Sequence, residues 1–312
     1  MQTIRKKRRM DRYGNTWKTN VFLLSLLLIP LLNFLVFTVY ANLGGIFLSF
    51  RQFDYNIKKE VFVFFQNYER FFRDFYTKQY DKSVWVSLAY LPVVGGISLP
   101  ISIITAFFLY KKIPFSKLIV ILLYIPNIIP AAVMAEFYRR MWDAGGGVVQ
   151  TGFLTQLFSF VSGREINWLV SPQYANWAIW IYTVWFGFGF NALLIWGAMS
   201  RVPQEVVEAA QLDGAGLFVE FTKVTVPIIW PTLSMVIVLT VTVPFQVYMQ
   251  PLLLAANGDH GTRTIALLAI QEMKRPDPYF AATINILVAC ISIPTVLLVK
   301  KLTDKAFETV EI

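Results

Sequence analysis

The chain has 312 residues, of which 56% are hydrophobic, 16% aromatic and only 15% charged. Soluble globular proteins carry about 25% charged residues, so much of this surface faces something other than water. The single histidine and the single cysteine, His260 and Cys290, exclude an internal disulfide and a thiolate metal site, and they remove most general-base chemistry.

A basic cluster precedes the first apolar stretch. Residues 5–9 read Arg-Lys-Lys-Arg-Arg, an arrangement typical of a cytoplasmic anchor beside a membrane helix. The net charge of +9 therefore needs no nucleic acid as a partner. We predict a basic cytoplasmic N-terminus at 1–20 and a first transmembrane helix at 21–50, which is too long and too uniformly apolar for a cleaved signal peptide.

Six stretches are long and apolar enough to cross a bilayer, which needs about 20 apolar residues in helical form. They are centred on 21–43, 83–110, 118–142, 174–200, 227–254 and 281–299. None of them carries a charge in its central part. The sequence therefore predicts an all-α transmembrane bundle of six helices with both termini in the cytoplasm, a core at 83–300 and a short cytoplasmic tail at 301–312.

The predicted outer segment, 51–82, contains an amphipathic helix. Tyr68, Phe71, Phe72, Phe75 and Tyr76 recur at the spacing of one helical face, with charged residues between them. Such a helix either lies on the outer membrane surface or covers the end of the bundle.

The cytoplasmic loop 201–227, between the fourth and fifth predicted spans, is too structured for a linker. Pro203 suits the first turn of a helix, and Glu205 and Glu208 place negative charge at the positive end of its dipole. Gly214 and Gly216 can take positive φ and end the helix sharply. This pattern predicts a helix–turn–helix at the cytoplasmic face of the membrane.

The same loop resembles a known motif. Glu208-Ala209-Ala210, Asp213-Gly214-Ala215, Phe221, Lys223 and Pro227 are similar, in identity and spacing, to the "EAA" loop of binding-protein-dependent ABC importer permeases. The segment 245–248, Phe-Gln-Val-Tyr, resembles the carbohydrate-uptake branch of that family, namely its maltose-permease-like and glycerol-phosphate-permease-like first subunits. One run differs from the family pattern, because 256–260 reads Ala-Asn-Gly-Asp-His where many members have Thr-x-Gly-Gly-Gly-Pro.

The resemblance implies a type I permease bundle in the bacterial cytoplasmic (inner) membrane, in which the 203–224 loop is a coupling helix that docks on an ATPase. The residues that it assigns to ATPase coupling are Glu205, Glu208, Ala209, Ala210, Asp213, Gly214 and Ala215. The partners that it implies are a second homologous permease subunit, two ATPase subunits, an extracytoplasmic solute-binding protein, a sugar or oligosaccharide, and membrane lipid. Because the chain has no Gly-x-x-x-x-Gly-Lys-Ser/Thr motif, ATP and Mg are expected on the partner subunits, and no catalytic residue or metal site is expected here.

Polar and aromatic residues inside the spans are candidates for the substrate pathway, since the bilayer penalises polar groups without a purpose. They are Gln246, Tyr248, Phe245, Asn191, Trp185 and Gln250. Hydrogen bonding between helices and aromatic packing are the alternative for each of them. A glycine pair, Gly187 and Gly189, is better explained by helix packing than by ligand binding.

Two other transporters and an enzyme compete with this interpretation. A secondary transporter driven by an ion gradient predicts carboxylates within the membrane, and the spans have none centrally. An ABC permease for a solute other than a sugar also stays open. A membrane enzyme is the weakest alternative, because paired carboxylates, a histidine cluster and a nucleophile motif are all missing from the sequence.

Overall fold

The computed structural model describes residues 17–77, 80–143, 145, 151–163, 166–275 and 278–306, so the basic cluster at 5–9 lies outside the described residues. The helices are α2 (Trp17–Asn33), η1 (Phe34–Tyr40), α3 (Ala41–Ser49), α4 (Gln66–Tyr76), α5 (Asp81–Val93), η2 (Val94–Ser98), α6 (Leu99–Tyr110), α7 (Ser116–Ile128), α8 (Ala131–Met141), α9 (Phe153–Ser162), η3 (Trp168–Val170), α10 (Ala175–Met199), α11 (Gln204–Leu212), α12 (Leu217–Val219), η4 (Glu220–Thr225), α13 (Val226–Gln246), α14 (Met249–Leu254), α15 (Ile265–Met273) and α16 (Tyr279–Ala306). Two short strands, β1 (Arg51–Asp54) and β2 (Lys59–Phe62), pair antiparallel.

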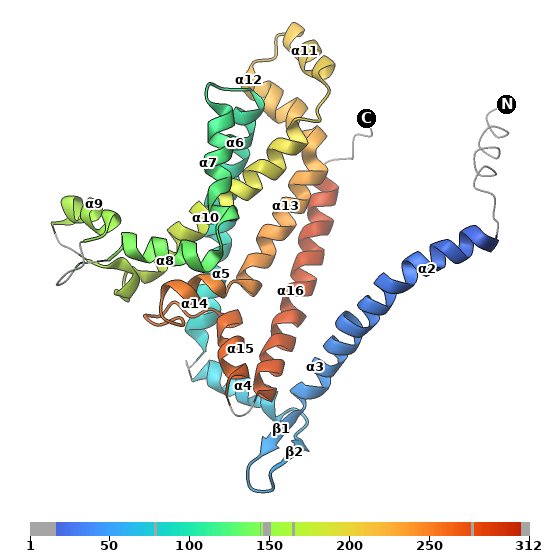
Figure 1. The fold of residues 1–312 in the computed structure, drawn as a ribbon, viewed down its shortest axis with the longest axis vertical. Coiled ribbons are helices and arrows are strands. Elements are labelled where there is room, and N and C mark those ends of the chain that lie inside the picture. The colour runs from blue at the N-terminus through green and yellow to red at the C-terminus, as the bar shows by residue number, and fades with distance from the viewer. Residues whose placement is uncertain are drawn as a thin grey trace.

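Long apolar helices follow the long axis of the molecule (Figure 1). Those long and apolar enough to cross a membrane are Thr19–Ser49, Lys82–Tyr110, Ala175–Met199, Leu217–Gln246 and Tyr279–Ala306. They coincide with the first, second, fourth, fifth and sixth predicted spans. The α11–α12 end of the bundle and the β1–β2 end lie at opposite ends of this axis (Figure 1).

The third predicted span, 118–142, is not one straight helix. It consists of α7 and α8, which bend by 104° at the break between them. Pro130 has no N–H to donate to the carbonyl of Pro126, and the residue before it, Ile129, takes an extended conformation with ψ 136°. Counted as one broken span, the pair brings the total to six. The third predicted span is therefore broken at Ile129, and α8 leaves the bundle axis (Figure 1).

The fifth predicted span, 227–254, also extends too far. α13 ends at Gln246, and the chain turns before α14 begins at Met249. In a continued helix the carbonyl of Val247 would face Pro251, which has no N–H. The Thr264 hydroxyl donates to this carbonyl instead, at 2.5 Å, so the break is stabilised by a residue from the following loop.

The segment 51–82 departs from the all-α prediction, because it contains the β1–β2 hairpin. The hairpin is fixed to the bundle through Asn67, which is buried and donates to the carbonyls of Ser49 and Arg51 at 2.9 and 2.8 Å. The carbonyl of Ser49 also accepts from Thr283 of α16, at 3.1 Å. One buried amide thus holds the end of α3 and the start of β1 against α4.

The amphipathic helix predicted in this segment is α4, and it covers the end of the bundle. Phe71 is buried in a cluster with Tyr80 and Phe280, and Arg70 lies over the Phe280 ring with its guanidinium carbon 4.1 Å from the centroid. Tyr76, at the end of the helix, remains exposed. These contacts agree with the prediction that the helix covers the end of the bundle, and not with a position on the outer membrane surface.

The glycine pair in α10 has two different surroundings. A Cβ on Gly189 would collide with the Leu123 carbonyl of α7, whereas a Cβ on Gly187 would meet nothing within 4 Å. Gly189 therefore allows α7 and α10 to pack with their backbones close together, as small residues do between membrane helices. The helix-packing interpretation is confirmed for Gly189 alone.

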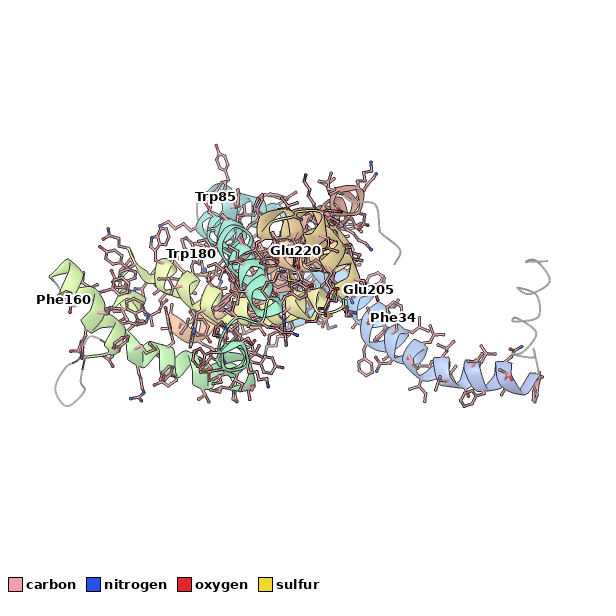
Figure 2. The ribbon with its side chains drawn as sticks, turned by 90° about the horizontal axis from the view of Figure 1, so that it is seen from above. Phe34, Trp85, Phe160, Trp180, Glu205 and Glu220 are labelled. Carbon is pink, nitrogen blue, oxygen red and sulfur yellow. The ribbon has the colours of Figure 1, made fainter. Side chains whose placement is uncertain are left out.

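The first apolar helix leaves the bundle as an arm. From α3, beside α16, the arm runs through η1 and α2 away from the other helices (Figure 1). Seen from above, Phe34 lies on this arm, near the place where the arm leaves the edge of the bundle (Figure 2). None of the most apolar part of Thr19–Ser49 is buried against the rest of the chain. The apolar surface of this part of the arm is free to contact lipid or another membrane protein.

Candidate functional site

Residues 203–224, here called the coupling segment, form a compact hook at one end of the bundle (Figure 1). α11 starts after Pro203 and ends where Asp213 donates its N–H to the carbonyl of Ala209, at 3.0 Å. Gly214 has φ +83°, the left-handed conformation that ends a helix. Gly216 has φ −73° and an extended ψ, so only one of the two predicted glycines takes positive φ.

Most of the predicted coupling residues share the exposed side of this hook. Glu205 lies at the edge of the bundle in the view from above (Figure 2). Glu208 accepts a hydrogen bond from the Gln204 amide, at 2.8 Å. The exposed residues are Glu205, Glu208, Ala209, Asp213 and Gly214, and the half-buried ones are Ala210 and Ala215.

Large apolar side chains are also exposed on the coupling segment, and we call them the apolar contact residues. They are Val206, Leu212, Leu217, Phe218 and Val219. Leu212 is 88% exposed and Phe218 is 78% exposed. Exposed apolar groups gathered on one short element mark a surface that contacts another protein or a membrane.

The opposite side of the coupling segment is anchored in the bundle. Val207 is buried in a cluster with Val202 and Ile229, at the ends of α10 and α13. The ring of Phe221 packs on that of Phe107 of α6, with 4.8 Å between the centroids. The segment is therefore attached to three helices rather than suspended between two.

A buried charge completes the attachment, and we call Glu220, Lys111 and Gln211 the Glu220 clasp. The Glu220 side chain is 1% exposed. One carboxylate oxygen accepts from the Lys111 ammonium, just after α6, and the other accepts from the Gln211 amide of α11 at 3.0 Å. In the view from above, Glu220 lies within the bundle while Glu205 lies at its edge (Figure 2).

Sequence reasoning did not single out the Glu220 clasp. The one available signal was an acidic residue between apolar neighbours, Val219 and Phe221, in a region that also contains a short basic turn at 111–112. Nothing in the spacing showed that the two regions meet, because they are more than one hundred residues apart in the chain.

The predicted pathway residues do not line one common cavity. Phe245 lines an apolar hollow of about 290 Å³ with residues of α4, α5 and α16. Trp185 lines a different hollow, of about 460 Å³, beside Trp177 and Trp180 of α10. Gln246, the last residue of α13, is exposed.

The other three pathway candidates are half-buried. Tyr248 and Gln250 lie at and just after the turn that ends α13, and Asn191 lies on α10. Gln246, Tyr248 and Gln250 therefore concentrate at one irregular backbone segment, which is the kind of segment that membrane proteins place beside a cavity. Their role in the pathway stays a prediction.

A polar hollow that the sequence did not reveal lies between α8 and the loop after α14, with a volume of about 440 Å³. Its charged and polar lining residues are Glu136, Arg139, Arg140, Asp143, Asn167 and His260. Glu136 pairs with Arg139 at 3.6 Å and with Arg140 at 3.0 Å, so its one negative charge offsets only one of the two positive charges.

The apolar spans, the broken helices and the anchored hook together define a class of protein, the membrane-embedded permease subunit of a transport system. Comparison with known proteins identifies the family. Residues 98–305 match the family described as the binding-protein-dependent transport system inner membrane component. This match covers more than half of the chain, and the chain belongs to that family.

Curated relatives and solved structures agree with this assignment. The chain is 28% identical over 266 residues to a trehalose/maltose transport system permease protein of Thermococcus litoralis, covering 84% of this chain and 87% of the relative. It is 24% identical over 278 residues to an arabinooligosaccharides transport system permease protein of Bacillus subtilis, covering 87% and 85%.

Among solved structures, a bacterial ABC transporter for import of the acidic polysaccharide alginate matches with a TM-score of 0.77 at 18% identity, covering 92% of this chain and 96% of that one. A bacterial alginate ABC transporter in complex with its pentasaccharide-bound periplasmic protein also gives 0.77, at 19% identity, covering 94% and 97%. The likeness confirms the predicted fold class, a type I permease bundle. The β1–β2 hairpin is the feature that the all-α prediction did not include.

Proposed function

We propose that this chain is one permease subunit of an ATP-driven importer for a sugar or oligosaccharide, and that it forms half of the translocation pathway. The observation that carries the proposal is the coupling segment, which exposes the apolar contact residues on one side while Val207 and the Glu220 clasp hold its other side in the bundle. A rigid, anchored apolar hook fits helix-in-groove recognition by a partner protein.

We propose two ATPase subunits as the partners of this hook. ATP and Mg are bound and ATP is hydrolysed there, and this chain performs no covalent chemistry. Movement of an ATPase groove would act first on Glu205, Glu208 and the apolar contact residues, and it would then reach α6, α10 and α13 through their contacts with the coupling segment.

The substrate class is proposed from the relatives, whose printed names refer to trehalose and maltose, to arabinooligosaccharides and to alginate. Sugars present both hydroxyl groups and apolar ring faces. Gln246 and Gln250 offer amides for the hydroxyl groups, and Tyr248 offers an aromatic ring for the apolar face.

A second homologous permease subunit supplies the other half of the pathway, and the unburied arm Thr19–Ser49 supports the presence of such a neighbour in the lipid. We propose a bacterial inner-membrane location, in agreement with the family description. Both termini then lie in the cytoplasm. α16 ends toward the same end of the bundle as the coupling segment, and α2 lies on the part of the arm that rises toward that end from α3 (Figure 1). A solute-binding protein delivers the sugar at the opposite face.

Uptake by the complete complex tests this proposal. The chain is reconstituted in proteoliposomes with its companion permease, the ATPase subunits and the binding protein, and radiolabelled maltooligosaccharides and arabinooligosaccharides are offered. We expect uptake that requires ATP and the binding protein and that persists when ion gradients are collapsed. Uptake that continues without ATP and stops with the ion gradient would establish a secondary transporter instead, and ATP-driven uptake of non-sugar solutes alone would refute the substrate class.

A further inference from the structure

Glu220 is buried among groups that come from three different parts of the chain. Lys111 follows α6, Gln211 lies on α11, and Glu220 itself begins η4, which continues into α13. The Lys111 ammonium also lies 5.7 Å from the ring centroids of both Phe107 and Tyr110. Two rings and a carboxylate therefore lie around the ammonium group, whose side chain is 23% exposed while that of Glu220 is 1% exposed.

This arrangement differs from an ordinary surface ion pair. Exposed pairs contribute little, because water and salt screen them. A buried carboxylate that loses its partner is strongly unfavourable, so a buried pair resists separation once it has formed. The turn after α6 and the coupling segment are consequently held at a fixed separation, although the α6–α7 turn is not part of the coupling motif.

We infer that Glu220 is a positioning residue that ties the coupling segment to the turn after α6, so that both move as one unit during the transport cycle. The inference rests on the proposed function. A force applied to α11 reaches α13 directly through η4, and it reaches α5 and α6 through Lys111. Without the clasp, only the apolar contacts of Val207 and Phe221 link the coupling segment to α6, so α6 follows a tilt of α11 less closely.

A purely structural role for Glu220 makes a different prediction. If the clasp only helped the chain to fold, its loss would reduce assembly of the complex, and the assembled fraction would transport normally. If the clasp positions the coupling segment, the complex assembles and still hydrolyses ATP, but less solute is carried for each ATP consumed. The ratio of solute transported to ATP hydrolysed separates the two roles.

The test uses the Glu220→Gln variant in the complete reconstituted complex. Glutamine keeps the size of the side chain and one acceptor oxygen, and it removes the charge. We expect the transport-to-hydrolysis ratio to fall about tenfold, within the range of coupling between distant sites, while the amount of assembled complex is unchanged. Lys112→Gln is the matched control, because Lys112 is the exposed neighbour of Lys111 and its loss should leave the ratio as in the wild type.

The double variant Lys111→Glu with Glu220→Lys exchanges the two charges and keeps the pair. The Gln211 amide can present its oxygen to the new ammonium group, so we expect the ratio to recover to within about threefold of the wild type. A wild-type ratio in Glu220→Gln would overturn the inference. If Glu220→Gln does not assemble, the exchange decides: restored assembly and ratio support the inference, and any other result overturns it.

Failure of the inference can be told apart from failure of the proposed function. If the wild-type complex shows no ATP-dependent uptake, the proposed function is wrong. If the wild type is active and Glu220→Gln matches it, only the positioning role is wrong.

Discussion

Leu212→Asp and Phe218→Asp will each release the ATPase subunits while the chain stays inserted in the membrane. Leu212 and Phe218 are 88% and 78% exposed, so neither substitution removes packing within the chain. In the complex these side chains are expected to enter an apolar groove, and a carboxylate there would lose its hydration without gaining a partner. Central apolar contacts of this kind contribute about 2 kcal/mol or more each, so affinity should fall by about thirtyfold or more. Titration of the detergent-purified permease pair with the ATPase measures this affinity.

Phe160→Asp is the matched control for these two variants. Phe160 is 91% exposed, and it lies on α9, far from Glu220 in the view from above (Figure 2). We expect it to leave ATPase affinity unchanged. Equal affinity for all three variants and the wild type would show that the apolar contact residues take no part in the interface.

Gly214→Val will uncouple transport from ATP hydrolysis, whereas Gly216→Val will not. Gly214 has φ +83°, where a β-branched residue is strongly disfavoured, and the strain is about 1–2 kcal/mol. Relief of that strain must change the turn that orients α11, and 1–2 kcal/mol shifts a two-state equilibrium by about 5–30-fold. ATP-dependent uptake should fall by at least about fivefold.

Gly216→Val is the matched control for Gly214→Val. The φ of Gly216 is −73° with an extended ψ, and no atom lies within 4 Å of an added Cβ at either glycine. The two variants therefore differ in backbone strain and not in crowding. Equal uptake by both would mean that the geometry of this turn does not control coupling.

Periodicity and composition predicted the helices well, but not where two of them break. A proline within a span can break a helix, yet the prolines at positions 92 and 294 lie inside continuous helical stretches. The breaks at Ile129 and Val247 occur where a proline four or fewer residues ahead cannot complete the helix, and at Val247 the Thr264 hydroxyl also stabilises the turn. That stabilisation depends on tertiary contacts, which local sequence does not contain.

In the candidate site, too, local sequence predicted some features, while others depend on tertiary contacts. The exposed side of the coupling segment carries a local motif, and the resemblance of that motif to the "EAA" loop was enough to assign the residues from Glu205 to Ala215. The anchored side could not, because the Glu220 clasp joins residues from distant parts of the chain. The pathway candidates were chosen by residue type, and type alone did not show that Phe245 and Trp185 line different hollows.

The most direct test of the account is the side of the membrane on which the coupling segment lies and what covers it there. Leu212→Cys is introduced into a Cys290→Ala background, which removes the exposed native cysteine, and a membrane-impermeant thiol reagent is applied to intact cells and to inverted vesicles. We predict no labelling in intact cells, full labelling in inverted vesicles stripped of ATPase, and protection when the ATPase subunits are added back. Labelling from outside the cell, or labelling that the ATPase does not reduce, would contradict the account.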